Sequence, residues 1–207
     1  MPVDANIAEY FQHLGGLGGR TEASERGGAA IVLDDAVARA VSLSLATKQS
    51  GGRVLFVGNG GSAAIASHMA TDWLKNGGYA ATCFNDGATL TCLGNDLGYD
   101  QVFALQIERH GRAGDLLFAI SSSGKSRNIL NAATAAMEVG VKVITLTGFG
   151  PDNPLRRMGD LNFWLPDYHY GFAEIGHLAI CHAILDMSMG WRRVGDLPVA
   201  TAAAVAG

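Results

Sequence analysis

The chain has 207 residues, of which 48% are hydrophobic and 16% are charged, and this suits one α/β domain with a full core. The composition excludes a mini-protein that needs disulfides or metals to fold, and it excludes an intrinsically disordered chain. The 15 Lys and Arg against 19 Asp and Glu give a formal net charge of −4. Without a basic surplus, a non-specific nucleic-acid binder is not expected.

Two helices are predicted before the first apolar strand. Residues 4–14 carry apolar side chains at a helical period, with Asp4 as a possible cap. The glycines within 15–19 break this pattern, and the polar stretch through Gly28 predicts a loop. The apolar spacing over residues 31–49 predicts the second helix.

The middle of the chain alternates short apolar runs with helical stretches. The predicted strands cover residues 54–57, 80–84, 116–120, 141–146 and 161–165. Such runs between helices predict a parallel sheet covered on both faces. The predicted helices of this part end near residue 75 and cover 128–139 and 171–189. The segment 191–207 is expected to be partly disordered or packed on a partner subunit.

The cysteines and the apolar segments bear on the compartment. Cys83, Cys92 and Cys181 are odd in number and match neither a disulfide framework nor a zinc knuckle. Each lies in an apolar stretch, so we expect buried free thiols in a reducing compartment. The first residues hold no apolar region of signal-peptide length, and no apolar run approaches the roughly 18 residues of a transmembrane helix. A soluble, cytoplasmic protein without membrane partners is predicted.

Two strand-to-helix junctions consist of small and hydroxylated residues. The first is GNGGS, residues 58–62, and the second is SSSGKS, residues 121–126. In an open parallel sheet, ligands bind at the carboxyl ends of the strands, where small residues and helix N-termini favour an anion. These loops predict a phosphate site. They are neither a dinucleotide fingerprint, because Ala63 replaces its last glycine, nor a Walker A loop, whose first glycine is missing.

Two helices carry residues suited to metal binding or proton transfer. His68 and Asp72 are four residues apart and share one helix face. On the last long helix, Glu174 and His182 share a face, whereas His177 is only an approximate neighbour there. Singly, each histidine is more often a satisfied polar group than a ligand. Together, two histidines and two carboxylates can form a tetrahedral metal site or an acid–base pair. Whether the two helices meet stays open.

The ordered motifs resemble one known family. VGNGGSAAIASH, CLGNDLGYDQVF, AISSSGKSRNILNAA and VKVITLTG are similar to the sugar isomerase (SIS) domain family, and within it to the phosphoheptose isomerase branch. The resemblance covers roughly residues 30–190. It implies a five-stranded parallel sheet flanked by helices, a phosphosugar substrate, zinc or another divalent metal in each subunit, and no nucleotide cofactor. It also implies a homo-oligomer, in this family usually a tetramer. The chain then divides into an N-terminal helix and Gly-rich loop (1–29), an SIS domain (30–190) and a C-terminal tail (191–207).

The resemblance also assigns roles to residues. The implied substrate-binding residues are Asn59, Gly60, Gly61, Ser62, Asp72, Asn95, Asp96, Ser121, Ser122, Ser123, Ser126 and Glu174. The implied metal ligands are His68, Asp72, Glu174 and His182, with Glu174 at a position where the family often has Gln. Asp72 and His182 are the implied catalytic residues.

One residue departs from the family pattern. The family's catalytic base is a Glu four residues after the first histidine, and Asp72 stands at this position. Its side chain is shorter by one methylene. Because general-base catalysis depends first on geometry, this change either lowers activity or marks a different substrate.

The resemblance implies an aldose–ketose isomerisation, in the first place of sedoheptulose 7-phosphate to glycero-manno-heptose 7-phosphate through a metal-assisted enediol. The serine loop would anchor the phosphate, and Asp72 would remove the proton next to the carbonyl. His182 would move the oxygen-bound protons, while the metal would polarise the carbonyl.

Two other functions stay open at this point. The chain is alternatively a non-catalytic phosphosugar-binding module, since a relative in the same branch binds the bacterial replication initiator protein. Such a module does not need His68, Asp72, Glu174 and His182 together, yet all four are present. The third possibility is an isomerase of another phosphosugar, such as arabinose 5-phosphate. Those enzymes commonly carry two regulatory repeats, for which the segment after residue 190 is too short.

Overall fold

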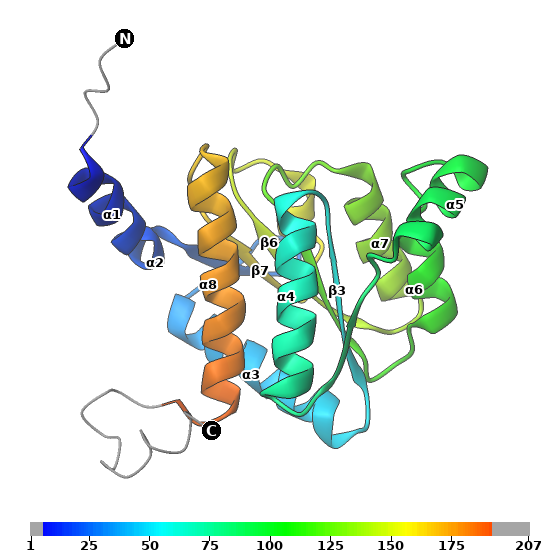
Figure 1. Ribbon diagram of the computed structural model, residues 1–207. Coiled ribbons are helices and arrows are strands. Elements are labelled where there is room, and N and C mark those ends of the chain that lie inside the picture. The colour runs from blue at the N-terminus through cyan, green and yellow to red at the C-terminus, as the bar shows by residue number, and fades with distance from the viewer. Residues whose placement is uncertain (1–5, 192–207) are drawn as a thin grey trace.

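Five parallel strands form the centre of the sheet and alternate with helices (Figure 1). The computed structural model describes residues 6–191. The strands are β3 (Arg53–Gly58), β4 (Ala80–Cys83), β5 (Leu116–Ser121), β6 (Lys142–Thr147) and β7 (Leu161–Trp164), in the spatial order β7-β6-β5-β3-β4. Each overlaps one predicted strand, so the parallel arrangement is confirmed.

Side chains of the central strands alternate between two buried faces. Phe56 and Phe118 point to one face, where their rings stack with centroids 5.0 Å apart, and Leu55 and Leu117 point to the other. The first face is covered by α3 (Leu33–Gln49), α4 (Gly61–Lys75) and α8 (Tyr170–Ser188), and the second by α6 (Ala104–His110) and α7 (Arg127–Glu138). Because both faces are buried, these strands are continuous apolar runs.

Two further strands extend the sheet beyond β7, and the first of them lies where the polar sequence predicted a loop. β1 (Glu22–Glu25) pairs antiparallel with β7, and β2 (Ala30–Ile31) pairs antiparallel with β1. The Asn162 side chain donates to the carbonyls of Ser24 at 3.2 Å and Glu25 at 3.1 Å, so polar pairing supports this edge. The predictions of a loop through Gly28 and of five strands are therefore wrong here: the sheet is mixed and seven-stranded. The helix predicted from residue 31 begins two residues later.

The N-terminal helix forms as α1 (Ile7–Gly15), but its cap differs from the prediction. Asn6 Oδ1 accepts from the Ala8 N–H at 2.7 Å, whereas Asp4 lies outside the described residues. The following glycines do not leave an open break, because a short helix, α2 (Leu17–Arg20), forms there and buries Leu17. The apolar residues of α1 stay largely exposed, with Ile7 at 70%.

Residues 87–110 include two helices where none was predicted, α5 (Gly87–Leu97) and the short α6. A 3₁₀ helix, η1 (Pro154–Arg157), precedes β7. None of the described helices is long and apolar enough to cross a membrane, and the cytoplasmic location stays a prediction. The predicted tail lies outside the described residues from position 192 on, and the domain boundaries also stay predictions.

The three cysteines are free thiols in different surroundings. Cys181 is buried as predicted and Cys83 is half-buried, but Cys92 is exposed on α5, so the prediction is wrong for Cys92. Its helix packs only part of its surface against the sheet. Burial raises the pKa of Cys181 to about 12, so this thiol stays protonated and unreactive at neutral pH.

Candidate active site

The glycine-rich loop (58–62) and the serine loop (121–126) meet at the carboxyl edge of the sheet, where the neighbouring strands β3 and β5 end (Figure 1). They border a cavity of about 240 Å³. Its lining consists of Asn59, Gly60, Gly61, Ser62, Ile120, Ser121, Ser122, Ser123, Ser126, Tyr170 and Glu174. The structure therefore gathers all predicted residues of both loops at one place. It adds Ile120 and Tyr170, for which the sequence predicted no role in this site.

Three helices begin at this cavity without a side-chain cap in the described part of the chain. Their N-cap residues are Gly60 for α4, Ser126 for α7 and His169 for α8. The first N–H groups of a helix have no intrahelical partner and carry partial positive charge. The cavity therefore offers backbone donors suited to a phosphate.

Two glycines are required by the shape of the glycine-rich loop. Gly60 has φ 54° and ψ −122°, a conformation that residues with a Cβ rarely adopt. A Cβ on Gly61 would collide with the carboxylate of Glu174, so glycine at this position leaves room for that carboxylate beside the start of α4. This close approach puts Glu174 into the cavity.

The serine hydroxyls of the second loop differ in their partners. Ser121 Oγ and Ser126 Oγ lie 3.3 Å apart, and Ser123 Oγ accepts from the Lys125 N–H at 3.2 Å. Ser122 Oγ is buried and has no hydrogen-bond partner among residues 6–191. Because an unpaired buried hydroxyl is costly, an oxygen atom bound in the cavity would complete its hydrogen bonding.

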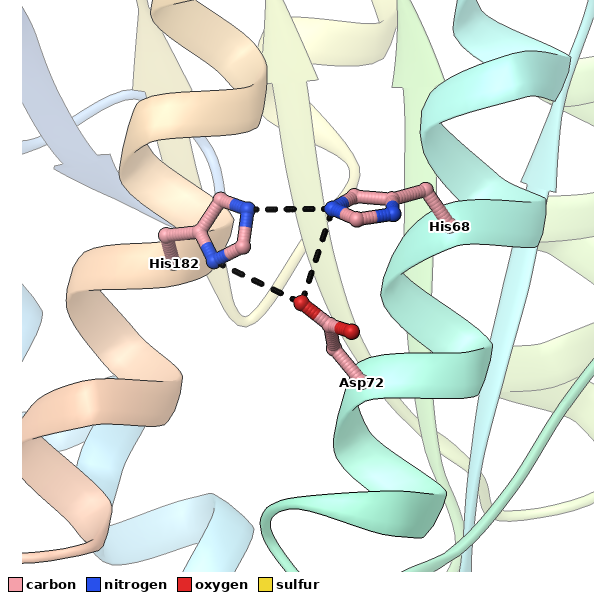
Figure 2. A group of neighbouring side chains, drawn as sticks. All are labelled: His68, Asp72 and His182. Atoms are coloured by element: carbon pink, nitrogen blue, oxygen red, sulfur yellow. Dashed lines mark hydrogen bonds and ion pairs between the residues drawn. The ribbon is translucent and has the colours of Figure 1, made fainter. Parts of the chain in front are cut away.

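Further along α4 and α8, away from the cavity, three predicted residues form a cluster (Figure 2). His68 Nε2 lies 3.3 Å from His182 Nε2 and 3.5 Å from Asp72 Oδ2, and His182 Nδ1 lies 3.9 Å from the same carboxylate oxygen. The His68 side chain is 52% exposed and that of Asp72 is 21% exposed. The packing of α4 against α8 thus joins these groups in one accessible site.

Glu174 lies apart from this cluster. Its carboxylate is at Gly61, seven residues before His68 on α4, and Glu174 precedes His182 by eight residues on α8. A helix rises 1.5 Å per residue, so these offsets are about 10 and 12 Å along the axes. The group of possible metal ligands in the described chain therefore contains three of the four predicted residues. A ligand role for Glu174 stays a prediction.

Asn95 and Asp96 lie on α5, outside the described lining of the cavity. Asn95 Nδ2 donates to Asp96 Oδ1 at 2.7 Å, and both residues are exposed. The segment after α5 does reach the glycine-rich loop, because the Tyr99 hydroxyl donates to Asn59 Oδ1 at 3.1 Å. Substrate contacts of Asn95 and Asp96 stay predictions.

His177 belongs to the core rather than to the cluster. It is fully buried in α8, and neither ring nitrogen has a hydrogen-bond partner within residues 6–191. Burial lowers its pKa to about 4. The backbone of Thr147 offsets part of this lowering, although its geometry to the ring falls short of a hydrogen bond. His177 is therefore neutral at pH 7.

We expect His177 to make the fold acid-sensitive. Between pH 6.5 and 4, the unfolded chain binds a proton at this histidine and the folded chain does not, so acid favours unfolding. Near pH 4 this lowers the free energy of unfolding by about 3 kcal/mol. In His177→Leu, we expect the free energy of unfolding to lose the pH dependence that comes from this histidine. Urea unfolding at several pH values measures it, with exposed His110→Leu as the control. If the free energy of unfolding changes equally with pH in wild type and in His177→Leu, buried His177 is not the source of the acid sensitivity.

Known proteins share these motifs and this fold. A family model described as the SIS domain matches residues 29–148. The phosphoheptose isomerase of Rhodospirillum rubrum is 41% identical over 157 residues, which cover 72% of this chain and 82% of that protein. The solved phosphoheptose isomerase of Neisseria gonorrhoeae is similar with a TM-score of 0.75 and 31% identity, over 88% of this chain and 97% of that one. A phosphoheptose isomerase from Francisella tularensis gives a TM-score of 0.74 with 29% identity, over 88% and 95%.

Proposed function

Because the chain belongs to the SIS domain family, we propose that it is a sugar-phosphate isomerase that interconverts sedoheptulose 7-phosphate and glycero-manno-heptose 7-phosphate. One observation carries this proposal: α4 and α8 combine a phosphate-type cavity at their N-terminal ends with the His68–Asp72–His182 cluster on their facing sides. The relatives named phosphoheptose isomerase support a heptose as the sugar. Measuring the aldose formed from sedoheptulose 7-phosphate tests the proposal.

The separation of cavity and cluster suits a substrate whose phosphate and carbonyl are at opposite ends. From Gly61 to His68, α4 advances seven residues, or about 10 Å. An extended sugar chain with a terminal phosphate covers a distance of this order. The phosphate would accept hydrogen bonds from the two loops while C1 and C2 lie between α4 and α8. Holding both ends fixes the reacting carbons next to the catalytic groups.

In this arrangement, the side chains of the cluster move the protons of the isomerisation. The Asp72 carboxylate takes the proton from the carbon next to the carbonyl. His182, 3.9 Å from that carboxylate, transfers a proton between the two substrate oxygens, because imidazole both donates and accepts near neutral pH. Asp72 then returns its proton to the neighbouring carbon. Carbonyl and hydroxyl exchange places, and no redox cofactor is consumed.

The cluster also fits a divalent metal such as zinc, one per subunit. The donors of His68, Asp72 and His182 are the nitrogen and oxygen types that zinc prefers. Bonds of 2.0–2.1 Å at tetrahedral angles need donors about 3.4 Å apart. His68 Nε2 lies 3.3 Å from His182 Nε2 and 3.5 Å from Asp72 Oδ2, and the donor atoms of all three residues lie within 4.8 Å of one another. When bound, the ion supplies positive charge beside the substrate oxygens. Glu174 would accept a hydrogen bond from a sugar hydroxyl in the cavity.

Removing one serine hydroxyl is expected to weaken substrate binding. Ser123→Ala deletes a hydrogen bond to a charged phosphate, which costs about 1.5–3 kcal/mol, so KM should rise roughly 10- to 150-fold. Steady-state kinetics with the sugar phosphate measures this. Ser42→Ala on α3, whose hydroxyl donates to the Ala38 carbonyl at 2.9 Å, is the control. An unchanged KM in Ser123→Ala would contradict the phosphate assignment.

A homo-oligomer, which we predict to be a tetramer, would cover the exposed face of α1. Ile7 and Phe11 are exposed, and beside α1 lies an apolar cavity of about 340 Å³ between α2, α3 and α8. Burying these surfaces against a second copy of the chain removes apolar area from water. Sedimentation equilibrium should give a mass well above 21.6 kDa. A monomer at every concentration would contradict this arrangement.

A further inference from the structure

Two side chains from other elements hold Asn59 of the glycine-rich loop. Asn59 Nδ2 donates to Asn128 Oδ1 at 2.9 Å, and Asn128 Nδ2 donates back to Asn59 Oδ1 at 2.9 Å. The Tyr99 hydroxyl donates to the same oxygen of Asn59 at 3.1 Å. These three residues, Asn59, Asn128 and Tyr99, are the asparagine clamp.

The clamp uses most of the hydrogen-bonding capacity of Asn59. A carboxamide oxygen accepts two hydrogen bonds and its nitrogen donates two. Oδ1 of Asn59 has both, and Nδ2 has one, among the residues described. Asn128 is only 3% exposed, so water does not readily replace it. The Asn59 side chain therefore fixes the loop and leaves mainly the backbone to face the cavity.

The clamp joins the two loops that form the cavity. Asn59 lies directly before Gly60, the N-cap of α4, and Asn128 is the second residue of α7, two positions after Ser126. Tyr99 comes from the segment between α5 and α6. Three separate parts of the chain thus meet at one side chain, and a shift of any of them would move the start of α4 relative to the start of α7.

We infer that Asn128 and Tyr99 are positioning residues that hold the first N–H groups of α4 and α7 at the spacing a phosphate requires. Both lie outside the described lining of the cavity, so they act through Asn59. Donors already held in place bind an anion more tightly than donors that must first be ordered. The inference rests on the proposed function, because it assumes that the cavity takes a phosphate ester.

Two variants test the clamp. Asn128→Leu keeps a similar side-chain size and removes both bonds to Asn59, whereas Tyr99→Phe removes one hydroxyl. For Asn128→Leu we expect the Kd of inorganic phosphate and the KM for the sugar phosphate to rise about tenfold. Its kcat should change by less than about threefold, because the phosphate is remote from the reacting carbons. Tyr99→Phe should raise the same Kd about threefold.

Matched controls separate positioning from general stability. Asn162 is a buried asparagine on β7 whose Nδ2 donates to the carbonyls of Ser24 and Glu25, so Asn162→Leu removes similar bonds that involve neither Asn59 nor the segment of Tyr99. Tyr168→Phe removes a hydroxyl from an exposed tyrosine. Both controls should leave the phosphate Kd within about twofold of wild type. Titration calorimetry gives Kd, and the thermal midpoint of each variant records stability separately.

Each result bears on the inference. A folded Asn128→Leu variant with the wild-type phosphate Kd overturns it, and so does an equal loss of phosphate binding in a folded Asn162→Leu variant. If Asn128→Leu does not fold, Tyr99→Phe decides, because Tyr99 is 59% exposed and its ring is kept; an unchanged Kd then overturns the inference. A wild-type protein that binds neither inorganic phosphate nor the sugar phosphate overturns the proposed function itself, and the clamp with it.

Discussion

The Asp72→Asn variant is expected to fold like the wild type and to lose about 100- to 10,000-fold in kcat. Asparagine keeps the volume of aspartate but cannot accept a proton, so the transfer from the substrate carbon stops. Circular dichroism checks the fold, and steady-state kinetics with sedoheptulose 7-phosphate measures the loss. Asp35→Asn on α3, an exposed aspartate that is not part of the cluster, is the matched control and should keep wild-type turnover.

Glu174 is the alternative candidate for the catalytic base. It is the other carboxylate near the proposed substrate path, and it lies in the cavity rather than in the cluster. If Asp72 is too short to reach the carbon and only orients His68, then Asp72→Asn keeps substantial turnover and Glu174→Gln abolishes it. That pair of results would contradict Asp72 as the base, while the proposed isomerisation itself would stand.

Removal of bound metal is expected to lower kcat roughly 100-fold or more, because positive charge beside the substrate oxygens is worth several kcal/mol in the transition state. Dialysis against a chelator followed by the isomerase assay measures this, and added zinc should restore the activity. Metal content per subunit should fall in His68→Ala and stay at the wild-type value in His110→Ala, an exposed histidine on α6. Full turnover by the metal-free protein would contradict a metal-assisted reaction.

The central sheet could be predicted because burial on both faces leaves a strong apolar signal in each strand. At the edge, the polar segment Glu22–Glu25 carries no such signal, and it becomes a strand only by pairing with β7 and through the side chain of Asn162. Asp4 and Asn6 are both residue types suited to an N-cap, and a sequence pattern does not choose between them; Asn6 has the extended backbone and the bond from the Ala8 N–H that a cap needs.

The candidate site was predictable where its residues are close in the sequence. Both loops are contiguous motifs, so the phosphate cavity follows from them and from strand order. His68 and Asp72 follow from a four-residue spacing, but their contact with His182 depends on how α4 packs against α8. Glu174 and His182 share a helix face, yet a shared face does not bring residues together across about two turns of helix. The clamp partners Asn128 and Tyr99 lie within quoted motifs, but their spacing in the sequence does not show that they contact Asn59, so this contact required the three-dimensional structure.

In the proposed function, this chain catalyses aldose–ketose isomerisation of a heptose phosphate. The most direct measurement is kcat/KM for a panel of C5, C6 and C7 ketose phosphates, with aldose formation followed for wild type and Asp72→Asn in parallel. We expect the wild type to convert sedoheptulose 7-phosphate and to prefer it over the C5 and C6 compounds, and we expect the variant to lose this conversion. Tight binding of these compounds without conversion of any would contradict the claim and indicate a phosphosugar-binding module, and a preference for a C5 compound would contradict the choice of a heptose.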